Sequence, residues 1–249
     1  MLVGERRELL LARLAAEGKV LAKDVAAEFG ISEDSIRRDL RDLAAAGLCQ
    51  RVYGGALPLS PAVADYASRT SIAVDGKDRV AALAADLVRP GSTVILDGGT
   101  TTLAVAKALP RDLEATVVTH SPTVAVALLD HHGIEVFLLG GRLFRHSAVT
   151  CGAAAAEAAQ AVSADVFLLG VTGVHPEAGL TTGDADEAAM KRTLARRAAD
   201  TFVLASAEKL GAASRFAVLP FGDVAGIVTD ADDQNVQELA AQGVAILRA

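Results

Sequence analysis

The sequence predicts two domains: a small, mainly helical domain that ends in a β-hairpin, followed by a larger α/β domain with a parallel sheet. Its 249 residues suffice for a small and a medium domain, each with its own core. Three helical patterns precede residue 47, whereas strand-like and helix-like segments alternate beyond residue 90. Pro58 and Pro61 separate the two patterns. We therefore expect domains at 1–57 and 76–249, with residues 58–75 as a linker.

Apolar residues at helical spacing, each run closed by a glycine, predict the first two helices. They span about residues 5–17, before Gly18, and residues 22–29, before Gly30, which supplies the left-handed residue of a sharp turn. Ser32 fits the N-cap of a third helix, because acidic residues follow it in the first turn. The stretch "LCQRVYGGALPL" is β-branched and aromatic and contains two glycines, which predicts a short hairpin, or wing.

The third helix separates apolar from basic side chains. On one side lie Ile36, Leu40 and Leu43, and on the other lie Arg37, Arg38 and Arg41, at about 100° per residue. One interpretation is a solvated helix face whose arginines are partly neutralised by the nearby acids Asp34, Asp39 and Asp42. The other is a basic face that reads DNA. The three helices, the tight turn and the glycine-tipped wing together favour the second interpretation.

The predicted arrangement is a winged helix-turn-helix, with the helix-turn-helix at about residues 20–39. In such domains the later helix enters the major groove, where arginine bonds guanine and a hydroxyl contacts base edges or phosphate. The wing then reaches the flanking backbone or the minor groove. The candidate DNA-binding residues are Ser35, Arg37, Arg38, Arg41, Arg51, Tyr53 and Gly54.

Charge is divided unevenly along the chain. The net charge is -7, yet residues 1–57 carry nine basic and nine acidic side chains, against 15 and 22 in the remainder. The first domain can therefore approach DNA, whereas an acidic second domain repels it. The charged N-terminus lacks a secretory pattern and no apolar run approaches a membrane span, so we expect a cytoplasmic protein. Cys49 and Cys151 have no metal-site spacing, and no metal is expected.

The second domain reads as a doubly wound, Rossmann-like α/β fold, because several strands are continuously apolar and alternate with helices. After a helix at 77–88, the expected strands lie near 93–97, 115–119, 134–139, 165–171, 201–205, 226–229 and 244–247. The expected helices lie near 101–109, 122–130, 152–162, 185–199 and 234–242.

A phosphate site is indicated by the stretch "ILDGGTTTLAVAKAL", in which a strand runs through glycines and threonines into a helix. Backbone N–H groups at a helix start bind anions; the alternative is an ordinary strand-to-helix turn. Loops after other strands carry similar residues and gather at the carboxyl edge of such a sheet. The candidate effector-binding residues are Asp97, Gly98, Gly99, Thr100, Thr101, Thr102, Thr119, His120, Ser121, Gly140, Gly141, Arg142, Lys191 and Lys209.

Three of these side chains also have ordinary interpretations. Lys191 and Lys209 are either surface lysines or charge partners of a ligand. His120 is more often a hydrogen-bonded loop histidine than an acid or base. Neither a G-x-G-x-x-G nor a P-loop motif follows any strand, so no dinucleotide or other cofactor is expected.

The segment "ERRELLLARLAAEGKVLAKDVAAEFGISEDSIRRDLRDLAAAGLCQRVYGGA" closely resembles the winged helix-turn-helix of DeoR-type bacterial transcriptional regulators. "LDGGTTT", "VVTHSP", "LLGG", "GLTTGDADEAAMKR" and "LASAEKLG" resemble that family's sensor domain in order and spacing. The resemblance implies an oligomeric repressor of a carbohydrate operon that releases its operator when a phosphorylated sugar binds. By position, Ser35, Arg37, Arg38 and Arg51 contact DNA, and the loop from Asp97 to Thr102 holds the phosphate.

The chain departs from the family pattern at three places and also suggests an enzyme alternative. Tyr53 stands where the wing usually has histidine, "VTHS" replaces the commoner "VTNS", and Ser206 to Lys209 replace an Asp-Ser-Ser-Lys motif. The second domain is also similar to ribose-5-phosphate isomerase. The isomerase's acidic segments correspond here to "LGVTG" (169–173) and to Met190-Lys191, which contain no carboxylate. We therefore expect a sensor that does not catalyse isomerisation.

Overall fold

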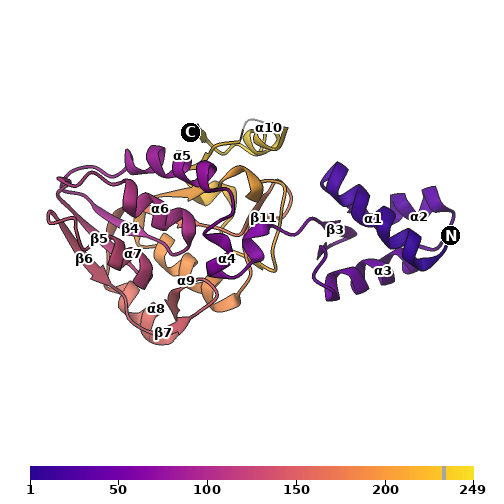
Figure 1. Ribbon diagram of the computed structural model, residues 1–249, viewed down its shortest axis with the longest axis horizontal. Helices are drawn as coiled ribbons and strands as arrows, with labels where there is room; N and C mark the ends of the chain where they lie inside the picture. Colours follow the sequence, from indigo (N-terminus) through magenta and orange to yellow (C-terminus); the bar gives the residue numbers. More distant parts are fainter. Residues whose placement is uncertain (232–233) are drawn as a thin grey trace.

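A computed structural model describes residues 1–231 and 234–249 as two domains joined by a single stretch of chain (Figure 1). The smaller domain, termed the head, extends to Leu57, and the larger one, termed the body, begins at helix α5 (Val74–Ala85). Residues 58–73 are termed the connector. The head lies at one end of the long axis and carries the N-terminus, whereas the C-terminus lies on the body (Figure 1).

The head contains three helices and a three-stranded sheet. The helices are α1 (Val3–Glu17), α2 (Ala22–Phe29) and α3 (Glu33–Ala45), and the sheet, in the order β1-β3-β2, contains β1 (Val20–Leu21), β2 (Gln50–Val52) and β3 (Gly55–Leu57). Leu10, Ile36 and Leu40 are almost completely buried at its centre. Ser32 caps α3 by accepting a hydrogen bond from the Ser35 backbone N–H, as predicted. The predicted helices and hairpin are confirmed, and the short strand β1 was not predicted.

The body is built on seven parallel strands in the order β15-β14-β12-β9-β4-β5-β6. They are β4 (Thr93–Leu96), β5 (Ala115–Thr119), β6 (Ile134–Leu138), β9 (Ala164–Gly170), β12 (Ala198–Leu204), β14 (Gly226–Thr229) and β15 (Ile246–Arg248). The chain starts at β4, builds outward to β6, returns to β9 and builds to the opposite edge. The direction of winding therefore reverses between β4 and β9, which is where open α/β sheets bind ligands. The predicted doubly wound fold is confirmed.

Helices cover both faces of this sheet. On one face pack α5, α6 (Thr100–Ala108) and α7 (Pro122–Ala127), and on the other pack α8 (Ala153–Gln160), α9 (Ala185–Ala195) and α10 (Gln234–Ala240). Side chains of β4 alternate between the two layers: Val94 and Leu96 contact the first core and Ile95 the second. This alternation explains why β4 is apolar throughout. Within the described residues, no helix is long and apolar enough to cross a membrane.

Several smaller elements were not predicted. They are the hairpin of β7 (Arg142–Phe144) and β8 (Val149–Cys151), a sheet of β10 (Gly173–His175), β11 (Gly179–Thr182) and β13 (Phe216–Ala217), helix α4 (Tyr66–Arg69), and the 3₁₀ helices η1 (Pro61–Val63), η2 (Ala207–Lys209) and η3 (Phe221–Asp223). Most are too short to show a hydrophobic period.

Three helices have boundaries that differ from the predicted ones by several residues, and one of them, α7, ends at Ala127 where residue 130 was predicted. Helix α5 spans 74–85 where 77–88 was predicted. The helix predicted at 185–199 ends at Ala195, because residues from Ala198 onward pair with β9 as the start of β12. Alanine favours helices, so tertiary pairing overrides local propensity here. The predicted linker also contains η1 and α4, and its residues Ser60 and Ala62 are buried, so this stretch is packed against its surroundings.

Candidate nucleic-acid interface and anion pocket

Helix α3 presents basic side chains on its exposed face. Arg38 and Arg41 are exposed and form no ion pair among the described residues, whereas Arg37 pairs with Glu33 at 2.6 Å. The Ser35 hydroxyl lies 2.9 Å from that of Ser32. Arg38 and Arg41 are thus free to contact phosphate or bases.

Two of the three acids that stand near these arginines in the sequence, Asp39 and Asp42, pair with α1 instead. Asp39 is buried and contacts Arg6 of α1 at 2.5 Å and Arg7 at 3.3 Å. Arg7 also pairs with Asp42. Both carboxylates therefore join α1 to α3 and do not neutralise the exposed arginines. The interpretation as a neutralised surface helix loses this support.

The hairpin adds further predicted residues beside α3. Arg51 is exposed on β2, and Tyr53 is fully exposed at the tip. Gly54 has a φ of 79°, in the left-handed region that favours glycine, which explains the two-residue turn. Arg37, Arg51, Tyr53 and Gly54 line one hollow between α3 and the hairpin.

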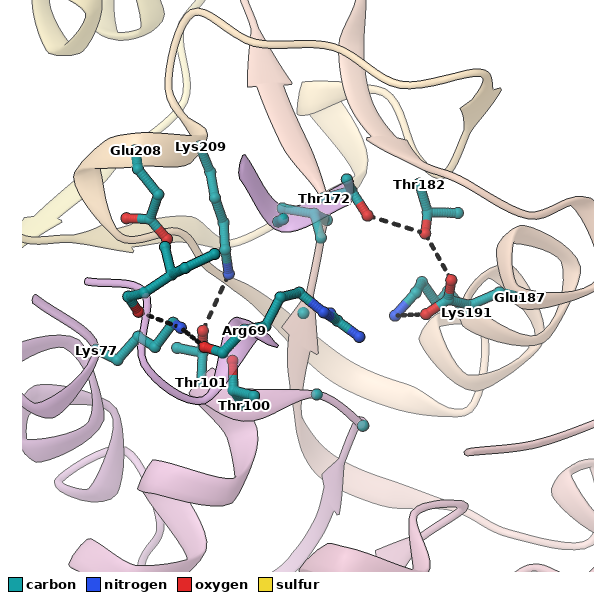
Figure 2. A pocket seen from close by; sticks show the side chains of 16 residues that line it. Arg69, Lys77, Thr100, Thr101, Thr172, Thr182, Glu187, Lys191, Glu208 and Lys209 are labelled. Carbon is teal, nitrogen blue, oxygen red and sulfur yellow. Dashed lines mark hydrogen bonds and ion pairs between the residues drawn. The ribbon is translucent and has the colours of Figure 1, made fainter. Parts of the chain in front are cut away.

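A polar pocket lies at the carboxyl ends of β4 and β9, at the reversal of strand order (Figure 2). The predicted effector residues that line it are Gly98, Gly99, Thr100, Thr101, Lys191 and Lys209. The polar lining residues that sequence reasoning missed are Arg69, Lys77, Thr172, Thr182, Glu187 and Glu208. The structure therefore brings together residues that are more than a hundred positions apart in the chain.

One end of the pocket is suited to an anion. Helix α6 begins after Gly99, whose φ is 111°, and no side chain caps it, so the N–H groups of its first turn are available to a ligand. The ammonium of Lys209 lies 3.0 Å from the Thr101 hydroxyl. Burial lowers the pKa of Lys209 to about 8; Glu208 opposes this shift and Lys77 adds to it. An anionic partner would therefore stabilise the charged form of Lys209.

Lys191 is already neutralised within the protein. Its ammonium lies 2.5 Å from Asp97 and 3.4 Å from Glu187. Burial alone would raise the pKa of Asp97 and lower that of Lys191. The combined charges and hydrogen bonds of their partners outweigh burial, so the pKa of Asp97 is lowered, by Lys191 and His120, and that of Lys191 is raised, by Asp97 and Glu187. His120 contacts Asp97 at 2.7 Å. Asp97, which orients His120, comes from outside the histidine's own motif, and this contact was not predicted.

The other predicted residues lie outside the lining of the pocket. The predicted residues Asp97, Thr102, Thr119, His120 and Ser121 are buried and do not line it. Asp97 accepts hydrogen bonds from the backbone N–H groups of Gly98 and Gly170, and so shapes the loop. Asp97 therefore supports the pocket from outside its lining.

Gly140, Gly141 and Arg142 do not line the pocket, contrary to the prediction. They follow β6, an edge strand two places from β4, so their loop starts too far from the reversal point. Arg142 instead pairs with Asp186 at 3.1 Å, and 78% of its side chain is exposed.

The opposite end of the pocket carries groups suited to hydroxyls. Glu187 accepts a hydrogen bond from the Thr182 hydroxyl at 2.8 Å, and Thr172 lies 3.4 Å from Thr182 (Figure 2).

The isomerase-like segments lack carboxylates, yet Glu187 and Glu208 bring two to the pocket from neighbouring positions. Among the described residues, no three His, Cys, Asp or Glu side chains are grouped to hold a metal ion.

Some of the missed residues had a sequence signal. Glu187 stands four positions before Lys191, which places both on one helix face, and Glu208 directly precedes Lys209. Arg69 of the connector and Lys77 of α5 had none, because the packing of both segments beside the sheet is a tertiary feature.

A winged helix-turn-helix head with a basic face, carried by a doubly wound body with a polar pocket, defines a DNA-binding protein with a ligand-binding domain. Residues 6–61 match the DeoR-like helix-turn-helix domain and residues 72–231 the DeoR C terminal sensor domain. The chain belongs to the DeoR family of transcriptional regulators.

Relatives over nearly the whole length bear transcription-related names. The chain is 33% identical to the putative aga operon transcriptional repressor of Escherichia coli O157:H7, over 91% of this chain and 86% of the relative. It is 30% identical to the transcriptional repressor GlcR of Bacillus subtilis, over 91% and 88% of the two chains. A solved ribose 5-phosphate isomerase A from Methanocaldococcus jannaschii aligns with a TM-score of 0.41 and 18% identity over 55% of this chain and 54% of that one. The protein is a DNA-binding transcriptional regulator and not an enzyme.

Proposed function

We propose that the protein represses a carbohydrate catabolic operon and leaves its operator when a phosphorylated sugar binds the pocket of the body. One observation carries this proposal: the uncapped N-terminus of α6 faces the same pocket as the buried ammonium of Lys209. A phosphoryl group accepts hydrogen bonds from backbone N–H groups, and its negative charge makes it a partner for the ammonium of Lys209.

The two ends of the pocket support a sugar as the carrier of that phosphate. Glu187, Thr172 and Thr182 offer hydrogen-bonding oxygens at the end opposite to Lys209 (Figure 2). Sugar hydroxyls donate to a carboxylate and exchange hydrogen bonds with threonine hydroxyls. A small polyol with a phosphate at one end satisfies both sets of groups.

We infer that release from DNA is a shift between conformational states in a cytoplasmic homo-oligomer. One head reads one half-site, so operator affinity depends on the spacing of two heads. If the sugar phosphate favours a state with different spacing, it weakens DNA binding, and DNA weakens sugar phosphate binding by the same factor.

Thermal unfolding in the presence of matched compounds tests the ligand assignment. The pairs are glucose with glucose 6-phosphate, fructose with fructose 1-phosphate, and glycerol with glycerol 3-phosphate. We expect a phosphorylated member to raise the unfolding midpoint while its parent does not, because only the native state binds it. Lys209→Met removes the ammonium and should lose this response, whereas Lys107→Met, on the exposed side of α6, should keep it. Equal stabilisation by sugar and sugar phosphate, or an unchanged response of Lys209→Met, would contradict the assignment.

A further inference from the structure

The connector forms part of the pocket wall. Ala62, Arg69 and Ile72 all line the anion pocket, although they belong to the stretch that joins head to body. Helix η1 of the connector packs against η2, which carries Lys209, and Leu59 forms a β-bridge with Ala213. A ligand in the pocket therefore touches the chain through which the head is attached.

Arg69 has unsatisfied hydrogen-bonding capacity inside this pocket. One terminal nitrogen donates to the carbonyl of His146 at 2.7 Å, whereas the buried Nε has no hydrogen-bond partner among the residues that the structure describes. The guanidinium reaches between the Lys209 side and the Glu187 side of the pocket (Figure 2). A buried N–H group without an acceptor is unfavourable, and an anion is the acceptor that suits a guanidinium best.

The connector ends in a restrained turn just before α5. Ala73 has a φ of 48°, a left-handed conformation that alanine rarely adopts. Lys77 holds this turn by donating to the carbonyls of Arg69 at 2.6 Å and Ile72 at 2.5 Å. Strain of this kind is held by surrounding contacts, so a change in those contacts can release it.

The pocket also shares a wall with the groove between head and body. Ala62, Thr172 and Glu187 line both, and Arg51 of the wing lines the groove from the head side. A displacement of the connector at Arg69 therefore alters the surface against which the head lies.

We propose that Arg69 is the residue through which an anion in the pocket acts on the head. The anion held by Lys209 and the start of α6 bonds the Nε and terminal nitrogens of Arg69, draws α4 toward the body and moves the connector that carries the wing. This rests on the proposed function, but it assigns signal transmission to a residue outside the sensor fold's strand loops.

Hydrogen exchange with inorganic phosphate as the probe tests the phosphate site and the role of Arg69 separately. The full chain is compared in millimolar phosphate and in chloride at equal ionic strength. We expect phosphate to slow exchange of amides at 98–103, where α6 starts, and at 66–73 in the connector. In Arg69→Gln, saturating phosphate should still protect the start of α6, with affinity lowered roughly 10- to 100-fold, and should no longer protect the connector. Arg111→Gln, an exposed surface change, should behave like the wild type.

The outcomes are distinguishable. Protection at 98–103 without protection at 66–73 in the wild type overturns the role of Arg69 and leaves the phosphate site standing. Connector protection that persists in Arg69→Gln also overturns it. Absence of protection at both segments contradicts the proposed phosphate site itself. If Arg69→Gln does not fold, Arg69→Lys replaces it, and its single ammonium should protect the connector less than the arginine fork does.

Discussion

Raising the pH from 7 to 9 should weaken sugar phosphate binding through Lys209. Burial lowers the pKa of this lysine to about 8, so its ammonium is lost within the range where ordinary lysines stay charged. About nine-tenths of the ligand-free protein carries the proton at pH 7 and about one-tenth at pH 9. If only the protonated form binds, the dissociation constant rises about tenfold over this interval.

The neighbours of Lys209 set the direction of this effect. Glu208 favours the ammonium, whereas Lys77, Arg69 and Lys191 disfavour it. The pKa of Lys77 is also lowered by burial, so any titration of Lys77 adds to the loss of affinity. A phosphate monoester has its second pKa near 6, so its own charge changes little above pH 7.

Isothermal titration of the phosphorylated sugar that most stabilises the protein, performed at several pH values, measures the effect. Binding at pH 8 to 9 should take up protons, because the bound phosphate raises the pKa of Lys209. Lys209→Arg keeps its charge and should show a flatter profile than the wild type. An affinity that is constant from pH 7 to 9, or equal pH profiles for both proteins, would refute the role of the Lys209 proton.

Three further substitutions test the head and the buried ion pair of Asp97. Arg38→Ala should lower operator affinity roughly 10- to 100-fold in a mobility-shift titration, since a base-contacting arginine contributes about 1–3 kcal/mol. Lys107→Ala should leave the affinity unchanged. Equal affinities of the two variants would remove Arg38 from the interface. Asp97→Asn leaves Lys191 with a weaker partner and should lower the free energy of unfolding by about 3 kcal/mol in urea, so a loss below about 1 kcal/mol would contradict the buried ion pair. Ser32→Ala removes the cap of α3 and should lower the stability of the head by about 1 kcal/mol, detected by circular dichroism; an unchanged midpoint would argue against the cap.

Local patterns were sufficient to predict the main sheet. The β4 segment is apolar on both faces, because Ile95 and Leu96 contact different helix layers, and such runs mark buried parallel strands. The turn at Gly30 and the Ser32 cap were likewise visible, since both depend on residues within a few positions.

Tertiary features account for what the sequence did not reveal. Gly140 to Arg142 follow a strand as Gly98 to Thr102 do, yet only strand order, which depends on long-range pairing, places one loop at the reversal point and the other near an edge. Arg69 lies in a weakly periodic stretch, and nothing near it in the sequence indicates that it enters the pocket. Asp39 looked like a neutralising neighbour of the basic face, but its partners lie more than thirty residues away in α1.

Control of DNA binding by the pocket is tested most directly by fluorescence anisotropy. A labelled operator duplex, which the protein has first selected from a random pool, is bound by the protein and then titrated with the phosphorylated sugars. We expect a phosphorylated sugar to displace the wild-type protein from the duplex and its unphosphorylated parent to leave it bound. Lys209→Met should stay bound throughout. Two results would contradict the claim that the pocket controls DNA binding. In the first, Lys209→Met is displaced at the same sugar phosphate concentration as the wild type. In the second, the phosphorylated compounds that stabilise the wild type do not displace it from the duplex.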